Sequence, residues 1–168
     1  LAISQDLYFH SPTQGRLSFK EAVISILNFI REEPQFHYRL IIGTDSRETD
    51  DSPPAQLFVT AIVIHRVGWG ARYFWRRTRT HSLYTIRDRI YQEALLSLQI
   101  SQKLMDFLDS FPDNHLSNYN VEIHVDVGNN GPTRSLIKEI VGMIEGMGFV
   151  AKVKPDSFGA SRVAHRHT

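Results

Sequence analysis

Three carboxylates in this sequence have the residue type and placement needed to bind a divalent cation. Asp45 ends the apolar stretch "YRLIIGTDS", and Asp126 lies in "VEIHVDVGNNG", where apolar and polar residues alternate as in a strand. Glu93 lies three residues after Ile90 in a predicted helix, so it points along the buried stripe of that helix. Carboxylates held close together repel each other, and a hard cation such as Mg²⁺ removes that repulsion.

Each of these acids also has a purely structural interpretation. Asp45 and Asp126 could cap turns at the ends of their strands. Glu93 could reach solvent or pair with an arginine such as Arg39 or Arg89. A single acid of this kind is more often structural, but two on neighbouring strands together with an inward-facing helical glutamate favour a cation site.

The elements that must position these acids are predicted by hydrophobic periodicity and turn residues. The stretch "LSFKEAVISILNFIREEP" predicts a helix that Ser18 caps, that Glu21 completes as a capping box and that Pro34 closes. After it come a strand around Asp45, a polar loop "RETDDSPP", and two strands, "AQLFVTAIVIHRV" and "WGARYFWRRTRT", whose short connection indicates an antiparallel hairpin.

The second half of the chain is predicted to alternate helices and strands. A long helix at 83–110 precedes the strand that carries Asp126, and the helix "GPTRSLIKEIVGMIEGMG", the strand "FVAKVK" and a short terminal helix follow. This order predicts an α/β fold with a five-stranded mixed sheet, its last two strands parallel to the first, and helices on both faces. We expect a single domain over 1–168, in which 1–36 forms an extra N-terminal helical extension.

Composition limits the function classes. The chain has 168 residues, 42% of them hydrophobic, and a net charge of +1, so any attraction for nucleic acid must come from local clusters of charge. It has no cysteine and no apolar run of the roughly 20 residues that a membrane helix needs. We expect a cytoplasmic protein that does not enter a membrane, and the sequence leaves its oligomeric state open.

An arginine-rich segment is the feature most typical of nucleic-acid binding. Arg72 and Arg76 alternate with aromatic residues, and such a surface can neutralise phosphates while its rings stack on bases. The structural alternative, which we favour slightly, makes Trp69, Tyr73 and Trp75 the buried face of the strand and leaves the arginines in solvent.

A second candidate phosphate contact lies at the turn "GNNGPTRS". Its backbone N–H groups would open a helix, and Arg134 adds a side-chain donor. The turn matches neither a P-loop nor a dinucleotide-binding fingerprint. We add Lys154 to the candidate nucleic-acid contacts.

The stretches "IIGTDS", "YQEALL" and "HVDVGNNGPTRSLIKEIVGMIEGMGF", the last followed by "KPDSFGAS", resemble the YkuK-like family of ribonuclease H-like proteins. The resemblance covers nearly the whole chain from Leu40 onward and is most specific from His124 to Ser161. It implies a ribonuclease H fold with strand order 3-2-1-4-5. In active members of that superfamily, acids on the first strand, the first core helix and the fourth strand hold two divalent metals for phosphodiester hydrolysis.

Carried over residue by residue, the resemblance implies that Asp45, Glu93 and Asp126 are the catalytic residues and ligands of Mg²⁺ or Mn²⁺. The superfamily often adds a fourth ligand on its last helix. This chain has His165 there, in "VAHRHT", where the family pattern has an acid. An imidazole suits Mn²⁺ better than Mg²⁺, and it could equally mark a member with weakened catalysis.

Ser46 and His124 are expected to support these ligands without binding the metal themselves. The leading interpretation is therefore a metal-dependent nuclease-like phosphodiester hydrolase. The alternatives are a catalytically weakened module on the same fold that binds nucleic acid or protein, and a nucleotide-binding phosphotransferase-like domain. The last is disfavoured because 168 residues leave no room for the second lobe that such enzymes close over ATP.

Overall fold

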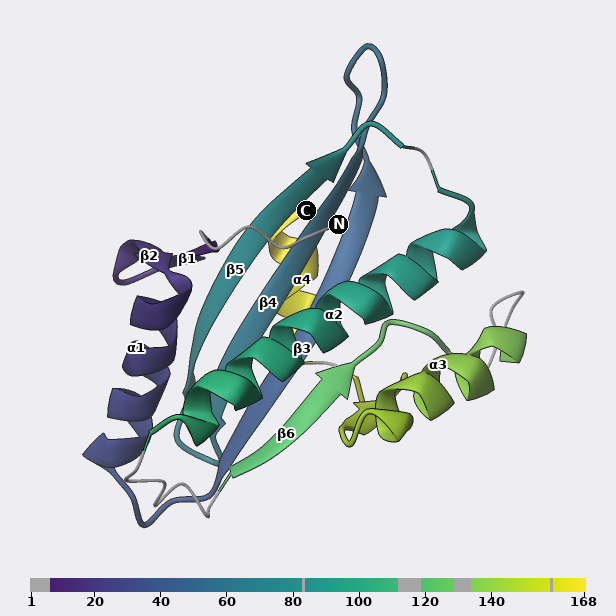
Figure 1. Cartoon of the computed structure of the whole chain (residues 1–168). Helices are drawn as coiled ribbons and strands as arrows, with labels where there is room; N and C mark the ends of the chain where they lie inside the picture. Colours follow the sequence, from purple (N-terminus) through teal and green to yellow (C-terminus); the bar gives the residue numbers. More distant parts are fainter. Residues whose placement is uncertain (1–6, 83, 112–118, 129–133, 158) are drawn as a thin grey trace.

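A seven-stranded mixed sheet with the order β2-β1-β5-β4-β3-β6-β7 forms the centre of the fold. The computed structural model describes residues 7–82, 84–111, 119–128, 134–157 and 159–168 (Figure 1). The strands are β1 (Tyr8–Ser11), β2 (Gly15–Ser18), β3 (Tyr38–Glu48), β4 (Gln56–Arg66), β5 (Ala71–Thr80), β6 (Tyr119–His124) and β7 (Val150–Lys152). The helices are α1 (Phe19–Glu32), α2 (Ile86–Asp109), α3 (Arg134–Gly146) and α4 (Ala160–His167).

The predicted arrangement of the five core strands is confirmed. Strands β3, β4 and β5 form an antiparallel meander, while β6 pairs parallel to β3 and β7 parallel to β6. Numbered from β3, the order β5-β4-β3-β6-β7 is 3-2-1-4-5. The predicted helices on both faces are also present, since α2 crosses one face of the sheet and α4 lies behind it (Figure 1).

The predicted count of five strands is wrong, because the N-terminal segment is not purely helical. Residues 8–18 form the hairpin β1–β2, and β1 pairs with β5 through His10 and Trp75. Phe9 in β1 is completely buried beneath α1. Each of these strands has four residues, too few for alternation to distinguish a strand from a loop in sequence. The hairpin also covers part of the β5 edge that would otherwise be open to another chain.

Three apolar clusters attach the helices to the sheet. The first lies under α1 and α2, the second joins α2 and α3 to β6, and the third lies under α4 on the opposite face. Helix α1 begins as predicted, because the Ser18 N–H donates to Glu21 Oε2 at 2.7 Å and the Glu21 N–H donates to Ser18 Oγ. No helix within the described ranges is both long and apolar enough to cross a bilayer.

A glycine in β3 allows α4 to lie directly on the sheet. A Cβ atom at Gly43 would be 3.0 Å from the Ala160 Cβ and 3.0 Å from the His124 carbonyl oxygen. Any larger residue would therefore push α4 away from β3. This close approach brings the far end of α4, with His165, over the part of β3 that carries Asp45.

Candidate metal centre

The two aspartates lie at the carboxyl ends of neighbouring parallel strands. The β3–β6 ladder ends at the pair Gly43 and His124, and Asp45 and Asp126 each follow two residues later. Because side chains on a strand alternate between faces, each aspartate continues the face of its ladder residue, which is the face that α4 covers. The sequence prediction that both acids sit at this edge is consistent with the register.

Asp45 is held by the C-terminal end of α4. Its Oδ2 atom lies 3.0 Å from the His165 Nδ1 atom and accepts a 3.3 Å hydrogen bond from the Thr168 hydroxyl. The Asp45 side chain is 15% exposed and the His165 side chain 84% exposed. The structure therefore brings together the two residues that were predicted on the first strand and the last helix.

Asp126 is paired with a lysine. The Lys154 Nζ atom lies 2.8 Å from Asp126 Oδ1, and the Lys154 backbone N–H donates to the Val127 carbonyl at 3.0 Å. That backbone contact fixes the residues after β7 beside those after β6. The ammonium group therefore occupies one side of the carboxylate predicted to bind a cation.

Glu93 approaches the same region from the other face of the sheet. It is only 7% exposed, and its Oε1 accepts a 2.6 Å hydrogen bond from the Ser46 hydroxyl. Ser46 follows Asp45 along β3, so the two side chains point to opposite faces. Ser46 thus contacts Glu93, one of the residues that it was predicted to support.

Burial and neighbouring charges make Glu93 the most perturbed acid of the group. Burial raises its pKa to about 7, against the lowering effect of the Ser46 hydrogen bond. The negative charges of Asp45 and Asp126 raise the pKa further, while Arg89 opposes them. Asp45 and Asp126 are therefore close enough to disfavour the ionised form of Glu93, and a bound cation would remove that repulsion.

A buried hydroxyl network lies beneath Glu93 and was not predicted. The Thr44 hydroxyl is 2.9 Å from the hydroxyls of both Thr60 and Ser97. The Ser97 hydroxyl in turn donates to the Glu93 carbonyl at 2.9 Å. The spacing of Glu93 and Ser97 on one face of α2 is the only sequence signal for this network.

His124 belongs to a separate buried hydrogen-bond network around Glu122. Its Nε2 atom lies 3.0 Å from Glu122 Oε2, and its Nδ1 accepts from the Gly159 N–H. Glu122 also accepts two hydrogen bonds from Arg39, the shorter at 2.6 Å. Burial lowers the pKa of His124 although Glu122 opposes the shift. His124 therefore anchors the loop before α4, and Arg39 is committed to Glu122 instead of Glu93.

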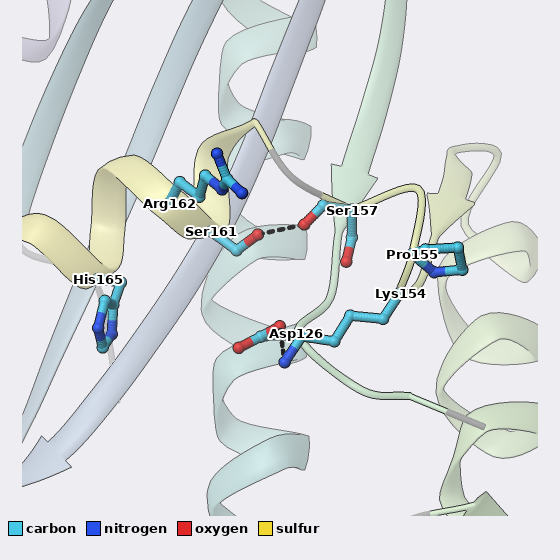
Figure 2. A pocket seen from close by; sticks show the side chains of 7 residues that line it. All are labelled: Asp126, Lys154, Pro155, Ser157, Ser161, Arg162 and His165. Carbon is cyan, nitrogen blue, oxygen red and sulfur yellow. Dashed lines mark hydrogen bonds and ion pairs between the residues drawn. The ribbon is translucent and has the colours of Figure 1, made fainter. Parts of the chain in front are cut away.

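A cavity of about 420 Å³ opens beside Asp126 (Figure 2). It is lined by Asp126, Lys154, Pro155, Ser157, Ser161, Arg162 and His165. Three of these residues, Asp126, Lys154 and His165, were predicted site residues. The sequence prediction gave no role to Ser157, Ser161 or Arg162, although the stretch "KPDSFGAS" places a cation and two hydroxyls within a few residues of one another.

The predicted nucleic-acid contacts are spread over different surfaces. Arg72 pairs with Glu32 at 3.2 Å and lies over the Phe29 ring, so its charge is partly satisfied within the protein. Half-buried Arg76 lines a hollow of about 460 Å³ with Tyr8, His10, Arg16 and Arg77. Arg134 begins α3, but its side chain and the predicted phosphate-binding turn at 129–133 lie outside the described residues.

The burial of the aromatic residues near these arginines differs from what the structural alternative predicted. Trp69 is 69% exposed in the turn between β4 and β5, so the expectation that it is buried is wrong. The fully buried ring of β5 is Phe74, which shares a face with Arg72 and Arg76. Tyr73 and Trp75 are partly buried beside the α4 cluster.

The side chains at this site are of the types that bind a hard cation, but they do not converge on one point. Carboxylate oxygens suit Mg²⁺, and an imidazole in the set suits Mn²⁺. However, among the described residues no three His, Cys, Asp or Glu side chains come together closely enough to hold a metal ion. Asp45 contacts His165 and Asp126 contacts Lys154 on one face of the sheet, whereas Glu93 contacts Ser46 on the other.

The chain belongs to the ribonuclease H-like family, whose sequence model matches residues 21–168. It is also similar to the uncharacterised protein YkuK of Bacillus subtilis (strain 168), with 30% identity over an alignment that covers 99% of each chain. The predicted family resemblance is thereby confirmed. No solved structure matches the chain significantly.

Proposed function

We propose that this protein is a divalent-cation-dependent hydrolase of phosphodiester bonds in nucleic acid. The observation that supports this function best is the electrostatic coupling of Glu93 on α2 with Asp45 on β3 and Asp126 after β6. These elements are the ones that carry the acids in active ribonuclease H-like enzymes. A buried carboxyl with a pKa near 7 is also more typical of functional sites than of surfaces.

The roles of the individual residues follow from their positions. Asp45 and Asp126 would hold the cation from the α4 face, with His165 beside Asp45 as a further donor and Glu93 closing the site from the α2 side. The cation would lower the pKa of the attacking water and neutralise the charge that develops on the phosphate. The protein side chains orient the phosphate and maintain the arrangement of the acids.

The test is cleavage of end-labelled single-stranded and duplex DNA and RNA in Mn²⁺ or Mg²⁺. We expect cation-dependent cleavage by the wild type and a loss of at least about a hundredfold in Asp126→Asn, because transition-state charge is left unneutralised. Asp106→Asn is a suitable control, because Asp106 is an exposed acid on α2 away from the site. Absence of cleavage in the wild type, or equal cleavage by Asp126→Asn, would contradict the proposal.

A second candidate function is nucleic-acid binding without cleavage. It is favoured by the Lys154 ammonium on Asp126, because a protein cation beside a carboxylate performs the neutralising role that an active site gives to metal. Under this alternative, nucleic-acid affinity would be the same in EDTA and in Mn²⁺. Affinity that rises on adding Mn²⁺, and that requires Asp126, would instead favour the hydrolase.

A further inference from the structure

The cavity beside Asp126 contains a buried hydroxyl that the protein does not satisfy. Ser157 is only 4% exposed, and its Oγ atom has no hydrogen-bond partner within the described part of the chain. Figure 2 shows this hydroxyl directed into the cavity, on the side where Lys154 and Asp126 lie. Burying an unpaired hydroxyl costs free energy, so such groups are usually completed by a ligand or by water.

The backbone of Ser157 is held by hydrogen bonds on both sides. The Ser157 N–H donates to the Val153 carbonyl at 3.1 Å, and the Ser157 carbonyl accepts from the Ser161 hydroxyl at 2.6 Å. The latter bond is drawn in Figure 2 and ties the residue to the first turn of α4. Two hydrogen bonds therefore hold the backbone that carries this hydroxyl.

The lining of the cavity has an excess of positive charge. Lys154 and Arg162 carry the cations, Asp126 carries the one carboxylate, and His165 adds a charge only when it is protonated. An anion that enters would compete with Asp126 for the ammonium group, and it could pair with the guanidinium of Arg162, which has no partner among the described residues. Arginine binds phosphate oxygens in a bidentate geometry, which makes a phosphate group a suitable anion.

The start of α4 strengthens this preference. The helix runs from Ala160 to His167, and its N-cap, Gly159, provides no side-chain hydrogen bond to the first turn. The N-terminal end of a helix carries partial positive charge and favours phosphate. Ser161 and Arg162 of this first turn line the cavity, so the positive end of α4 lies beside the unsatisfied Ser157 hydroxyl.

We infer that this cavity binds a phosphate group of the nucleic-acid chain through Lys154, Ser157 and Arg162. The inference deepens the proposed function, on which it rests for the source of the phosphate, because the cavity shares Asp126 with the candidate metal centre. Lys154 then pairs with Asp126 when substrate is absent and with the phosphate when substrate is bound.

The experiment measures binding alone, in EDTA and at low ionic strength, so that it does not depend on metal or cleavage. The probes are inorganic phosphate, a 5′-phosphorylated trinucleotide and a free nucleoside, which carries no phosphate and should have no effect. Binding is followed by calorimetry and by the amide NMR shifts of Ser161 and Arg162. We expect both phosphate-bearing probes to shift these amides. The 5′-phosphorylated trinucleotide should bind more tightly than inorganic phosphate. Equal affinity of these two probes would overturn the assignment to nucleic acid.

Two variants separate this site from general electrostatics. Arg162→Gln should weaken binding of the phosphorylated probe about tenfold, whereas Arg166→Gln, an equal charge change at an exposed position on the same helix, should leave it within about twofold. Equal losses in both variants would overturn the proposal, since they would indicate a diffuse field.

Ser157→Ala provides the sharpest signature. It removes an unsatisfied hydroxyl, so we expect an equal or higher Tm together with weaker phosphate binding. A lower Tm with unchanged binding would show that Ser157 has a structural role only. If phosphate does not bind while cation-dependent cleavage is present, the phosphate site is wrong and the proposed hydrolysis is unaffected. If binding is present and cleavage absent, only the proposed hydrolysis fails.

Discussion

The ammonium group of Lys154 lies 2.8 Å from the carboxylate of Asp126, one of the three acids predicted to bind a metal. Both side chains are partly exposed, at 56% for Lys154 and 36% for Asp126, so the ion pair is weak and exchangeable. A divalent cation bound at Asp126 would therefore compete with Lys154 for this carboxylate. This competition makes the role of the lysine measurable.

Replacing Lys154 by glutamine should strengthen Mn²⁺ binding by about 1.4-fold to fivefold, because an exposed ion pair contributes roughly 0.2–1 kcal/mol. Calorimetric titration of the variant and the wild type measures the change. Lys138→Gln, an exposed lysine on α3, controls for the loss of one positive charge. Weaker Mn²⁺ binding in Lys154→Gln would contradict the competition and would mean that Lys154 positions Asp126 for the metal.

Glu93 should make the stability of the protein fall as pH rises from about 4.5 to about 7 in EDTA. Burial, together with the charges of Asp45 and Asp126, raises the pKa of Glu93 in the folded state to about 7, from 4.5 when the side chain is solvated. Between these values the folded state binds the proton and the unfolded state does not, so each step upward in pH favours unfolding. The full effect is on the order of 3 kcal/mol.

Urea unfolding at a series of pH values measures this slope, and Glu93→Gln is the reference because it cannot titrate. As pH rises through this window, the unfolding free energy of the wild type should fall relative to that of the variant. His124 contributes in the opposite direction in both proteins and cancels in the comparison, since its lowered pKa disfavours folding below about 6.5. A difference independent of pH would contradict this account, because it would mean that the pKa of Glu93 is the same in the folded and unfolded states.

Arg76 and Arg72 should differ in their effect on nucleic-acid binding. Arg76→Gln should reduce the slope of log affinity against log salt concentration by about 1, because Arg76 lines a basic hollow and its Nε has no partner among the described residues. Arg72→Gln should leave the slope unchanged, because Glu32 already neutralises Arg72. Fluorescence anisotropy at several salt concentrations provides the measurement, and equal slopes for both variants would contradict this assignment.

The parts of the fold that could be predicted are those encoded in regular periodicity. The capping box of Ser18 and Glu21 and the consecutive apolar residues of β3 are local signals, and the order of strands followed from short connections and helical crossovers. Asp126 was identifiable because apolar and polar residues alternate up to it, and Asp45 because it follows a run of consecutive apolar residues. Their coupling to Glu93 followed from its place on the apolar stripe of α2.

What sequence could not provide are the relationships that depend on distant residues. The β1–β2 hairpin is too short to show alternation, and only its pairing with β5 makes it a strand pair. Ser157 reads as an ordinary loop residue, because its lack of a partner is visible only when Val153 and Ser161 fix its backbone. Likewise, sequence alone allowed Arg39 to pair with Glu93, but in the structure it pairs with Glu122, which is 83 positions away.

The central claim is that Asp45 and Asp126 bind a divalent cation together. The most direct test is a calorimetric Mn²⁺ titration of the wild type, the Asp45→Asn/Asp126→Asn double variant and an Asp106→Asn/Asp109→Asn double variant. The last removes the same charge from exposed positions on α2. We predict saturable binding in the wild type and the control, and binding at least about tenfold weaker in the site variant. Equal binding in all three proteins, or none in the wild type, would contradict the claim.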